Sequence, residues 1–270
     1  MNKDKTILKT LLLGSFFASL SALLGGSTFV FTRYVVDSID PYTLSFLRYG
    51  LTGLILFLLS ISVYMNKKFA KADLIPMCFL GLAMITLFPN FMALGLEHTT
   101  AARAGLLYAT MPLCTIIIAY FFNIEKITLN KSLAVLLAIL GVSFCMSERV
   151  DNNFQDTLKG DFLMMIGVLS ASCFTVFSGK YLKKYGNIPV MIFVILIGTI
   201  LNLIISMIFG NSITSLLEIN KFEAAALLML IIPGGVVMMY CWGKALQLIS
   251  PTQAAISLGF NPLSAILLGS

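Results

Sequence analysis

Residues 97–120 read EHTTAARAGLLYATMPLCTIIIAY, and residues 247–270, 150 positions later, read QLISPTQAAISLGFNPLSAILLGS. Each stretch begins with a short polar segment, continues with small residues and carries a proline midway through an apolar run. Four aligned pairs are identical, namely Ala104/Ala254, Pro112/Pro262, Leu113/Leu263 and Ile116/Ile266. The shared order of features at a fixed spacing indicates that the chain holds two copies of one unit.

The composition of the chain places both copies in a membrane. Hydrophobic residues make up 59% of the 270 residues and charged residues 11%, against roughly a quarter charged in a soluble domain. So few charged side chains cannot cover the apolar surface of a soluble protein of this length. We therefore expect the lipid bilayer to surround most of the chain.

Nine apolar stretches recur along the chain, and each is long enough, at about 20 residues, to cross about 30 Å of hydrocarbon as a helix. They are 8–34, 42–64, 74–96, 101–122, 129–146, 162–180, 188–209, 224–246 and 251–270. Strands of a membrane barrel alternate apolar and polar residues over about 10 positions, whereas these stretches are apolar all round. The sequence predicts an all-α polytopic membrane protein.

The two copies divide the chain at residue 150. Residues 1–150 hold five predicted helices, an odd number, so the copy in residues 151–270 enters the membrane from the opposite side. This predicts an inverted repeat of two five-helix units, with helices six to nine in the second. Because the second copy lacks a span after its proline helix, we expect a fragment or truncated form of a ten-helix protein; a natural nine-helix protein is the alternative.

Basic residues in the loops predict the orientation, because they concentrate on the cytoplasmic side. With the N-terminus inside, the inner segments hold 12 of the 18 basic residues, namely Lys3, Lys5, Lys9, Lys67, Lys68, Lys71, Lys126, Lys131, Lys180, Lys183, Lys184 and Lys244. The sequence predicts a multi-pass protein of the cell inner (plasma) membrane with a cytoplasmic N-terminus. Its net charge of +6 then reflects topology and anionic lipids, not nucleic acid.

Motifs of enzymes and ATP-driven pumps do not occur in the sequence. The chain has neither a G-x-x-x-x-G-K-[ST] loop nor the H-E-x-x-H or G-x-S-x-G spacing of hydrolases. Its five cysteines form no C-x-x-C pair, and its one histidine, His98, stands in a predicted outer loop. We expect no enzyme, no cofactor and no metal site.

Three segments together resemble the EamA branch of the drug/metabolite transporter superfamily. They are GGSTFVFTRYVVDSIDPYTLSFLRYGLTGLILFLL (25–59), LGLEHTTAARAGLLYATMPLCTIIIAYFFNIEKITLNKSLAVLLAILGV (94–142) and KALQLISPTQAAISLGFNPLSAILLG (244–269). The resemblance rests on a basic residue ending helix one, an arginine in helix two, mid-span prolines in helices four and nine, and a glutamate opening the loop before helix five. It implies a secondary transporter with a central cavity between two repeats, usually an exporter of amino acids or related metabolites. A homodimer is among the states that it allows.

Breaks within helices mark the expected cavity, since proline frees a carbonyl that must face protein, water or substrate in lipid. The candidate breaks are Gly25 and Gly26, Pro89 with Asn90, Pro112, Pro233 to Gly235, and Pro262. The alternative role of each proline is a kink that serves packing.

Arginines near the outer half form the candidate basic site. Arg48 lies about 10 Å from the outer end of helix two at 1.5 Å per residue, so its charge cannot easily reach water. Arg33 and Arg103 lie at similar or shallower depth and could join it in one site. In the alternative, Arg48 pairs with Asp37, Asp40 or Glu97, and the other two arginines extend to the interface.

Other polar and aromatic residues extend this substrate site or cavity. The further candidates are Thr28, Asn90, Tyr108, Pro112, Tyr240, Trp242 and Asn261. Aromatic residues in membrane helices also serve packing, which is the alternative role for several of them.

The sequence predicts alternating-access export of amino acids or related small carboxylated metabolites. No carboxylate lies deep in a predicted span, which disfavours exchange of protons for cationic drugs, whereas arginines match a carboxylated substrate. The alternatives are a proton-coupled drug or amine exporter of the same superfamily, a channel and a non-transporting membrane scaffold.

Overall fold

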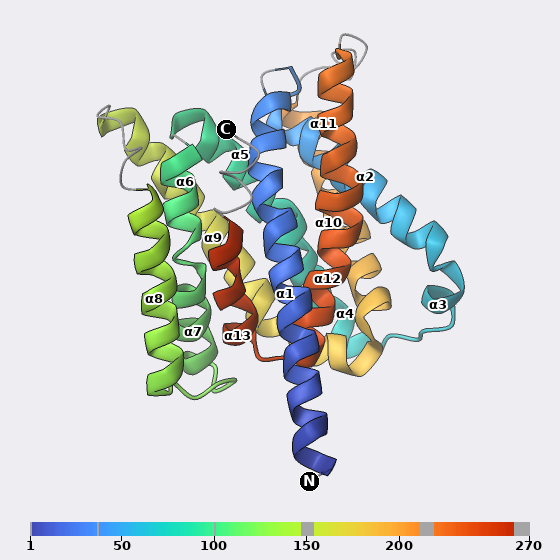
Figure 1. Cartoon of the computed structure of the whole chain (residues 1–270). Coiled ribbons are helices and arrows are strands. Elements are labelled where there is room, and N and C mark those ends of the chain that lie inside the picture. Colours follow the sequence, from blue (N-terminus) through green and yellow to red (C-terminus); the bar gives the residue numbers. More distant parts are fainter. Residues whose placement is uncertain (1, 37, 100, 147–153, 211–218, 262–270) are drawn as a thin grey trace.

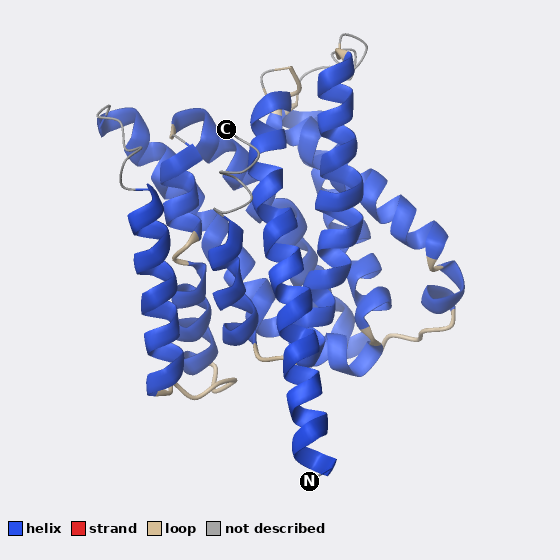
Figure 2. Cartoon of the chain, viewed as in Figure 1, coloured by secondary structure: helices blue, strands red, loops and turns tan. Residues whose placement is uncertain are grey.

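A computed structural model describes residues 2–36, 38–99, 101–146, 154–210 and 219–261. Within these residues helices are joined by short loops and no strand forms (Figure 2). The prediction of an all-α polytopic membrane protein is confirmed. Helices satisfy their own backbone hydrogen bonds, which lipid requires of a segment that crosses it.

The described helices fall into two sets. Residues 1–150 contain α1 (Asn2–Val35), α2 (Pro41–Leu59), α3 (Ile61–Met65), α4 (Lys71–Gly81), η1 (Leu82–Leu87), α5 (Phe88–His98), α6 (Ala101–Tyr108), α7 (Met111–Phe121) and α8 (Leu129–Met146). Residues 151–270 contain α9 (Phe154–Tyr185), α10 (Asn187–Phe209), α11 (Lys221–Ile231), η4 (Ile232–Val237), α12 (Met238–Leu248), α13 (Pro251–Ile256) and η5 (Ser257–Phe260).

Six helical runs in the described part are long and apolar enough to cross a membrane. They are Lys5–Val35, Pro41–Leu59, Lys71–His98, Leu158–Tyr185, Asn187–Phe209 and Lys221–Leu248. The predicted fourth span is instead broken between α6 and α7, because Pro112 in the first turn of α7 has no N–H to continue a helix. The predicted ninth span begins as α13 and η5, and residues 262–270 lie outside the described part.

Short polar residues begin several helices by accepting hydrogen bonds from free backbone N–H groups. The Asp40 carboxylate accepts from Tyr42 N and Thr43 N at the start of α2. Asn220 forms a capping box at the start of α11, and Ser250 does so at the start of α13. Each cap satisfies donors that a helix cannot satisfy itself, so these residues set where the helices start.

A shift of 150 residues superposes the element boundaries of the two halves. The bounds of α4, η1 and α5, shifted by 150, are those of α11, η4 and α12. In Figure 1, α1 leaves the end where the N-terminus lies, whereas α9 runs toward that end. We interpret this correspondence as the predicted inverted repeat divided at residue 150. Both copies share an unusual feature, since η1 and η4 are π-helical turns within otherwise α-helical spans.

Helices of the two halves pack against each other in the core. Neighbouring pairs are α1 with α12, α2 with α10 and α5 with α9. Small residues let the backbones approach, since a Cβ at Gly160 would lie 2.8 Å from the Gly95 carbonyl oxygen. Large apolar side chains such as Leu58, Leu137 and Ile208 remain exposed on the outside. They suit contact with lipid tails.

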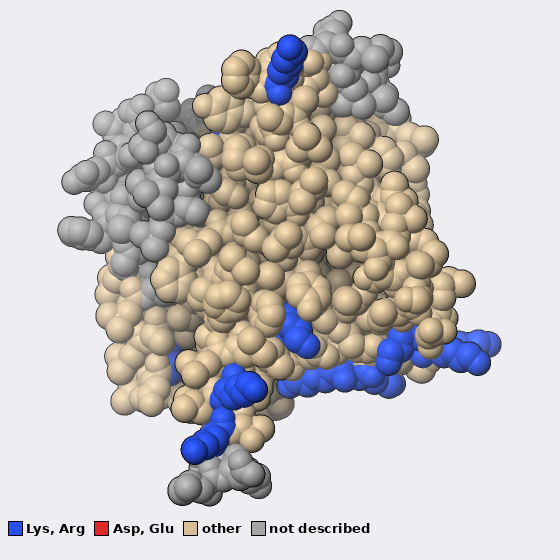
Figure 3. All heavy atoms as spheres, turned by 45° about the vertical axis from the view of Figure 1, so that its right-hand side comes forward, with Lys and Arg blue, Asp and Glu red and all other residues tan. Residues whose placement is uncertain are grey.

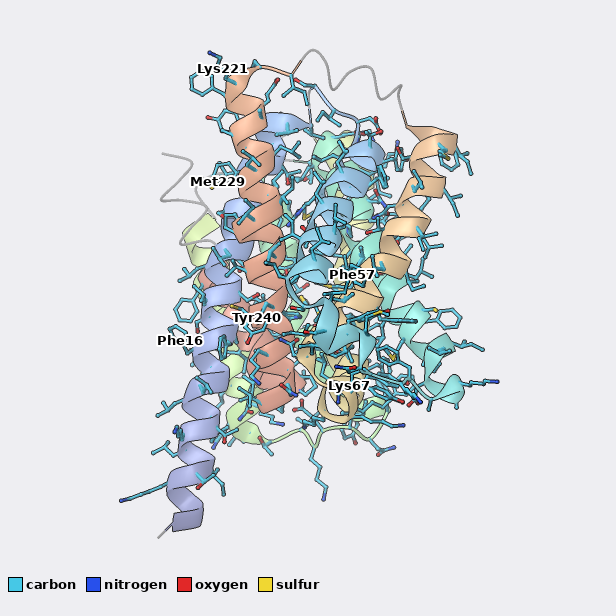
Figure 4. The ribbon with its side chains drawn as sticks, turned by 90° about the vertical axis from the view of Figure 1, so that its right-hand side faces the viewer. Phe16, Phe57, Lys67, Lys221, Met229 and Tyr240 are labelled. Atoms are coloured by element: carbon cyan, nitrogen blue, oxygen red, sulfur yellow. The ribbon has the colours of Figure 1, made fainter. Side chains whose placement is uncertain are left out.

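Basic side chains gather at one end of the bundle. In Figure 3, blue Lys and Arg atoms crowd the end where the chain begins, and a single group marks the opposite end. Figure 4 labels Lys67 at the first end and Lys221 at the second. We call them the Lys67 end and the Lys221 end. This distribution supports the predicted orientation with the Lys67 end in the cytoplasm, which stays a prediction.

Candidate functional site: a central cavity

A cavity of about 40 Å³ lies among helices from both halves of the bundle. Its lining residues are Ser21, Gly25, Thr28, Phe29, Arg48, Met84, Phe88, Met92, Tyr108, Met111, Met238, Met239, Trp242, Leu258 and Asn261. The first ten come from residues 1–150 and the last five from residues 151–270. This volume has room for about three water molecules at 10–15 Å³ each, so the walls must move apart to admit a larger molecule.

Several lining residues occupy equivalent positions in the two halves. The pairs separated by 150 residues are Phe88/Met238, Met92/Trp242, Tyr108/Leu258 and Met111/Asn261. The cavity thus lies where the repeats meet. Its charge is not symmetric, because the position equivalent to Arg48 is Gly198. Arg48 is therefore the one cationic group among the described lining residues, and it lies on the side that the first half forms.

Arg48 is 5% exposed and reaches the cavity from α2. Its Nη2 donates to the Gly234 carbonyl oxygen at 3.0 Å, and its guanidinium carbon lies 5.0 Å from the centre of the Tyr49 ring. Its Nε has no hydrogen-bond partner. Among the described residues no carboxylate lies within 4.0 Å of the guanidinium. Arg48 is thus a buried cation with no anionic partner among the residues that the structure describes.

The three carboxylates proposed as partners of Arg48 do not pair with it where the structure describes them. Asp40 caps the first turn of α2, two turns away, and Glu97 is exposed at the end of α5. Asp37 lies outside the described residues. The prediction of a scaffold ion pair for Arg48 therefore has no described partner to support it.

The carbonyl that accepts from Arg48 belongs to the π-helical turn η4. There the Met238 N–H donates to the carbonyls of Pro233 and Gly235 and bypasses that of Gly234. Thr52, one turn after Arg48 on α2, donates to the Ile231 carbonyl at 3.2 Å. Residues of the first half thus bind backbone oxygens within the irregular turn and directly before it in the second half. Such satisfaction by neighbouring helices is what allows a break in lipid.

Aromatic side chains form another wall of the cavity. The Tyr108 ring stacks on Phe88 with centroids 5.7 Å apart and meets Phe29 edge-on at 5.4 Å. The Tyr108 and Asn261 side chains interact with each other. Trp242 is 4% exposed, and its Nε1–H has no partner among the described residues. A buried indole N–H usually finds an acceptor, so Trp242 offers a second free donor at the cavity.

Five methionines are among the residues that line the cavity. Two further lining residues, Ser21 and Thr28, use their hydroxyl groups to donate to backbone carbonyls. The methionines are Met84, Met92, Met111, Met238 and Met239. The Ser21 hydroxyl donates to the Met238 carbonyl at 3.1 Å, and the Thr28 hydroxyl to the Gly25 carbonyl at 2.7 Å. Unbranched methionine side chains change shape easily, so the walls can adapt to a larger occupant.

Polar contacts between the halves close the molecule at both ends. At the Lys67 end, Asp73 pairs with Lys184 at 2.6 Å, and Glu125 accepts from the Thr252 N–H at 3.0 Å. At the Lys221 end, Ser38 donates to Glu223, and Thr99 donates to Asp161 at 3.0 Å. Each contact joins a residue of 1–150 to one of 151–270, so the two halves are fastened above and below the cavity.

Comparison with known families matches each half of the chain in turn. The model of the EamA-like transporter family matches residues 12–147 and again residues 158–270. The chain belongs to the EamA-like transporter family. The resemblance inferred from the sequence is confirmed, and the chain is that of a multi-pass membrane transporter.

EamA-like relatives cover nearly the whole chain. An uncharacterized transporter of Archaeoglobus fulgidus is 27% identical over 91% of this chain and 84% of its own. The uncharacterized inner membrane transporter YedA of Escherichia coli is 25% identical over 94% of this chain and 81% of its own. A crystal structure that is 17% identical has a TM-score of 0.75, covering 96% of this chain and 87% of that one. The last comparison shows that the fold is shared.

Half of the residues predicted for the site of this EamA-like protein line the cavity, namely Thr28, Arg48, Tyr108, Trp242 and Asn261. Arg33 is instead exposed near the end of α1. Tyr240 borders a separate pocket at the Lys67 end, and Pro112 is buried in the first turn of α7 without lining the cavity. The Arg103 side chain lies outside the described part.

Asn90 serves the backbone of the other π-helical turn. It donates to Asn202 at 2.9 Å and to the Thr86 carbonyl, and Asn202 donates to the Ile85 carbonyl at 2.8 Å. Asn202 stands 150 residues after Thr52, so each π turn of the EamA-like fold receives a polar side chain from the opposite half. This places Asn90 in a structural network beside the cavity.

The methionines, Phe29, Phe88 and Ser21 were missed by sequence reasoning, because apolar residues are unremarkable in membrane helices. The 150-residue shift could have identified some of them, because it aligns Phe88 with Met238, and both residues stand close to predicted helix breaks. No group of three or more His, Cys, Asp or Glu side chains suited to a metal occurs within the described ranges.

Proposed function

We propose that this EamA-like protein is a secondary transporter that exports a small carboxylated metabolite, an amino acid or a related acid, by alternating access. The carrying observation is Arg48, a buried guanidinium in an enclosed cavity with one hydrogen bond and no described carboxylate partner. The proposal places the chain in the cell inner (plasma) membrane with its N-terminus in the cytoplasm.

A carboxylate suits the unpaired charge of Arg48. A cation held in a low-dielectric interior is costly unless an anion pairs with it. A guanidinium offers several N–H groups in a plane, and a carboxylate can accept two of them at once. The bound acid would therefore satisfy the Nε of Arg48, which has no partner in the closed cavity.

The contacts between the halves support alternating access. Rocking one inverted repeat against the other exposes a shared midplane site to each side in turn. Opening the Lys67 end requires the Asp73–Lys184 contact to break, and opening the other end requires the Ser38–Glu223 contact to break. Solvent-exposed polar contacts of this kind contribute little to stability, so either set can open without unfolding the protein.

Metabolite profiling of cells tests this function. Medium and cytosol are compared for cells that express the chain, its Arg48→Ala variant or its Lys221→Ala variant, which removes an exposed cation at the end of the bundle. We expect one class of acid to accumulate in the medium with the chain and the Lys221 variant. Loss of a charged hydrogen bond worth about 1.5–3 kcal/mol predicts a roughly 10- to 100-fold weaker affinity for Arg48→Ala.

Two results would contradict the proposal. Export that is unaffected by Arg48→Ala would remove Arg48 from the site. A chain that moves no acid in either direction, in cells or in acid-loaded proteoliposomes, would favour the scaffold role. Uptake of the acid instead of its export would agree with a carrier but would show transport in the direction opposite to the proposed one.

A further inference from the structure

We propose that the exported acid has an apolar, preferably aromatic, body and carries no ammonium group, so that an aryl-substituted monocarboxylate binds in preference to the corresponding amino acid. This inference rests on the proposed function and narrows its substrate class. It follows from three properties of the cavity, namely its charge, its free hydrogen-bonding groups and its walls.

The first property is the single sign of charge. Among the described residues that line the cavity, Arg48 is the only ionised side chain, and none is an aspartate or a glutamate. The carboxylate of an amino acid would be paired by Arg48, but its ammonium group would be buried without an anion. An unpaired ion in an apolar interior costs several kcal/mol, which weakens binding of a zwitterion by more than about tenfold.

The second property is the kind of hydrogen-bonding group left free. The unpartnered groups of Arg48 and Trp242 are both N–H donors. The hydroxyl hydrogens of Ser21 and Thr28 already go to backbone carbonyls. A carboxylate supplies acceptor oxygens to such donors, whereas an ammonium group supplies only more donors. These donors favour the carboxylate end of a substrate, and no described lining residue supplies a carboxylate to pair with an ammonium group.

The third property is the composition of the walls. Five methionines, Phe29, Phe88, Tyr108 and Leu258 surround the polar groups. Thioethers and ring faces contact aromatic and other apolar bodies favourably, and the flexible methionines let the closed volume of about 40 Å³ expand around one. A short hydrophilic acid would not contact these apolar side chains, so they would stay in contact with water or with an empty space.

The tryptophan content of the chain makes a direct binding assay available. Trp242 is the single tryptophan, and it lines the cavity, so its fluorescence reports on the site alone. The purified full chain in detergent is titrated with 3-phenylpropanoate, phenylalanine, 2-phenylethylamine and acetate. The first three share a phenyl group and differ in charge, and acetate keeps the carboxylate without the ring.

We expect 3-phenylpropanoate to bind at least about tenfold more tightly than phenylalanine and acetate, and 2-phenylethylamine not to bind. Arg48→Ala should weaken the binding of 3-phenylpropanoate by roughly 10- to 100-fold, and Lys221→Ala should leave it unchanged. If Arg48→Ala does not fold, as judged by thermal unfolding, Arg48→Lys keeps the charge without the planar fork and should bind with intermediate affinity.

The other outcomes are decisive in different ways. Phenylalanine binding as tightly as 3-phenylpropanoate would overturn this inference and leave the proposed function intact, and so would equal binding of acetate. Binding of 2-phenylethylamine alone would overturn both. Absence of binding by all four would overturn the inference, while the profiling experiment decides the proposed function separately.

Discussion

Arg48 shows how one residue can define a site when its surroundings are apolar. A guanidinium on an exposed helix would be unremarkable, and Arg33 on α1 is such a case. At 5% exposure and with Gly234 as its only described hydrogen-bond partner, Arg48 has unused donors in an interior that disfavours free charge. The same side chain therefore binds the π-helical turn of the opposite half and remains available to a ligand.

Replacing Trp242 by phenylalanine tests the second free donor at the cavity. Trp242→Phe keeps an aromatic ring and removes the Nε1–H that has no partner in the closed site. We expect the half-saturating concentration of 3-phenylpropanoate in proteoliposome counterflow to rise about 5- to 10-fold, as for loss of one hydrogen bond.

Tyr240→Phe is the matched control for this substitution. Tyr240 lies two residues before Trp242 on the same helix but borders the pocket at the Lys67 end. Removing the Tyr240 hydroxyl should leave the half-saturating concentration of 3-phenylpropanoate unchanged. An equal effect of the two substitutions would show that Trp242 acts through the packing of α12 and not through its N–H.

At the scale of elements, the two π-helical turns distinguish this bundle from one of straight helices. They occupy equivalent positions, η1 in the first half and η4 in the second, and a carbonyl of each accepts a hydrogen bond from a polar side chain of the other half. A π turn moves backbone carbonyls out of the regular pattern, and such turns are frequent at functional sites. The irregular geometry therefore links the backbone of each half to the side chains of its partner.

Substitution of Gly235 by alanine tests how closely α2 must approach η4. An added Cβ would lie 2.1 Å from the Thr52 hydroxyl oxygen, so one of the two segments must move. We expect Gly235→Ala to destabilise the protein by about 1–3 kcal/mol, as for an overpacked core. The measurement is the midpoint of thermal unfolding in detergent.

Two further variants make this test specific. Thr52→Ala added to Gly235→Ala should recover part of the lost stability, because it removes the obstructing hydroxyl. Gly179→Ala should be nearly neutral, since its nearest neighbour, the Leu246 carbonyl oxygen, lies 3.5 Å from the added Cβ. Destabilisation by Gly179→Ala equal to that by Gly235→Ala would indicate that loss of any helical glycine is harmful.

For the whole molecule, the proposed mechanism needs the Lys67 end in the cytoplasm and the Lys221 end outside. Both lysines are exposed and lie at opposite ends of the bundle (Figure 4). We expect Lys221→Cys to react with a membrane-impermeant maleimide on intact cells, and Lys67→Cys to react only after the cells are opened. The unsubstituted chain is the control for its native cysteines. The reverse pattern would invert the predicted topology and with it the direction of transport.

Much of the fold could be predicted because lipid leaves few alternatives. The predicted fifth span has the bounds of α8, and the seventh differs from α10 by one residue. The fourth span was harder, since the apolar run continues through a break that Pro112 produces between α6 and α7. Proline is apolar, so a hydropathy pattern does not show that its N–H is missing. Composition alone therefore cannot predict that this span is two helices.

The candidate site was predictable only in part. A deep arginine is rare in a membrane helix, so Arg48 could be recognised from its position in the sequence. Tyr240 and Trp242 are two residues apart on α12, yet only Trp242 lines the cavity. Which of them faces the centre depends on the rotation of α12 against α1, which is set by contacts between residues more than 200 positions apart, such as Ser21 and Met238.

The sequence by itself determined the membrane class, the helices and the two family units, because these follow from apolar length, backbone hydrogen bonding in lipid and a repeat of fixed spacing. The tertiary structure alone decided which side chains meet. It brought Arg48 to Gly234, joined the two halves at both ends and gathered methionines around a cation that has no carboxylate partner among the described residues. Those features arise from packing one half against the other, and no local pattern in either half contains them.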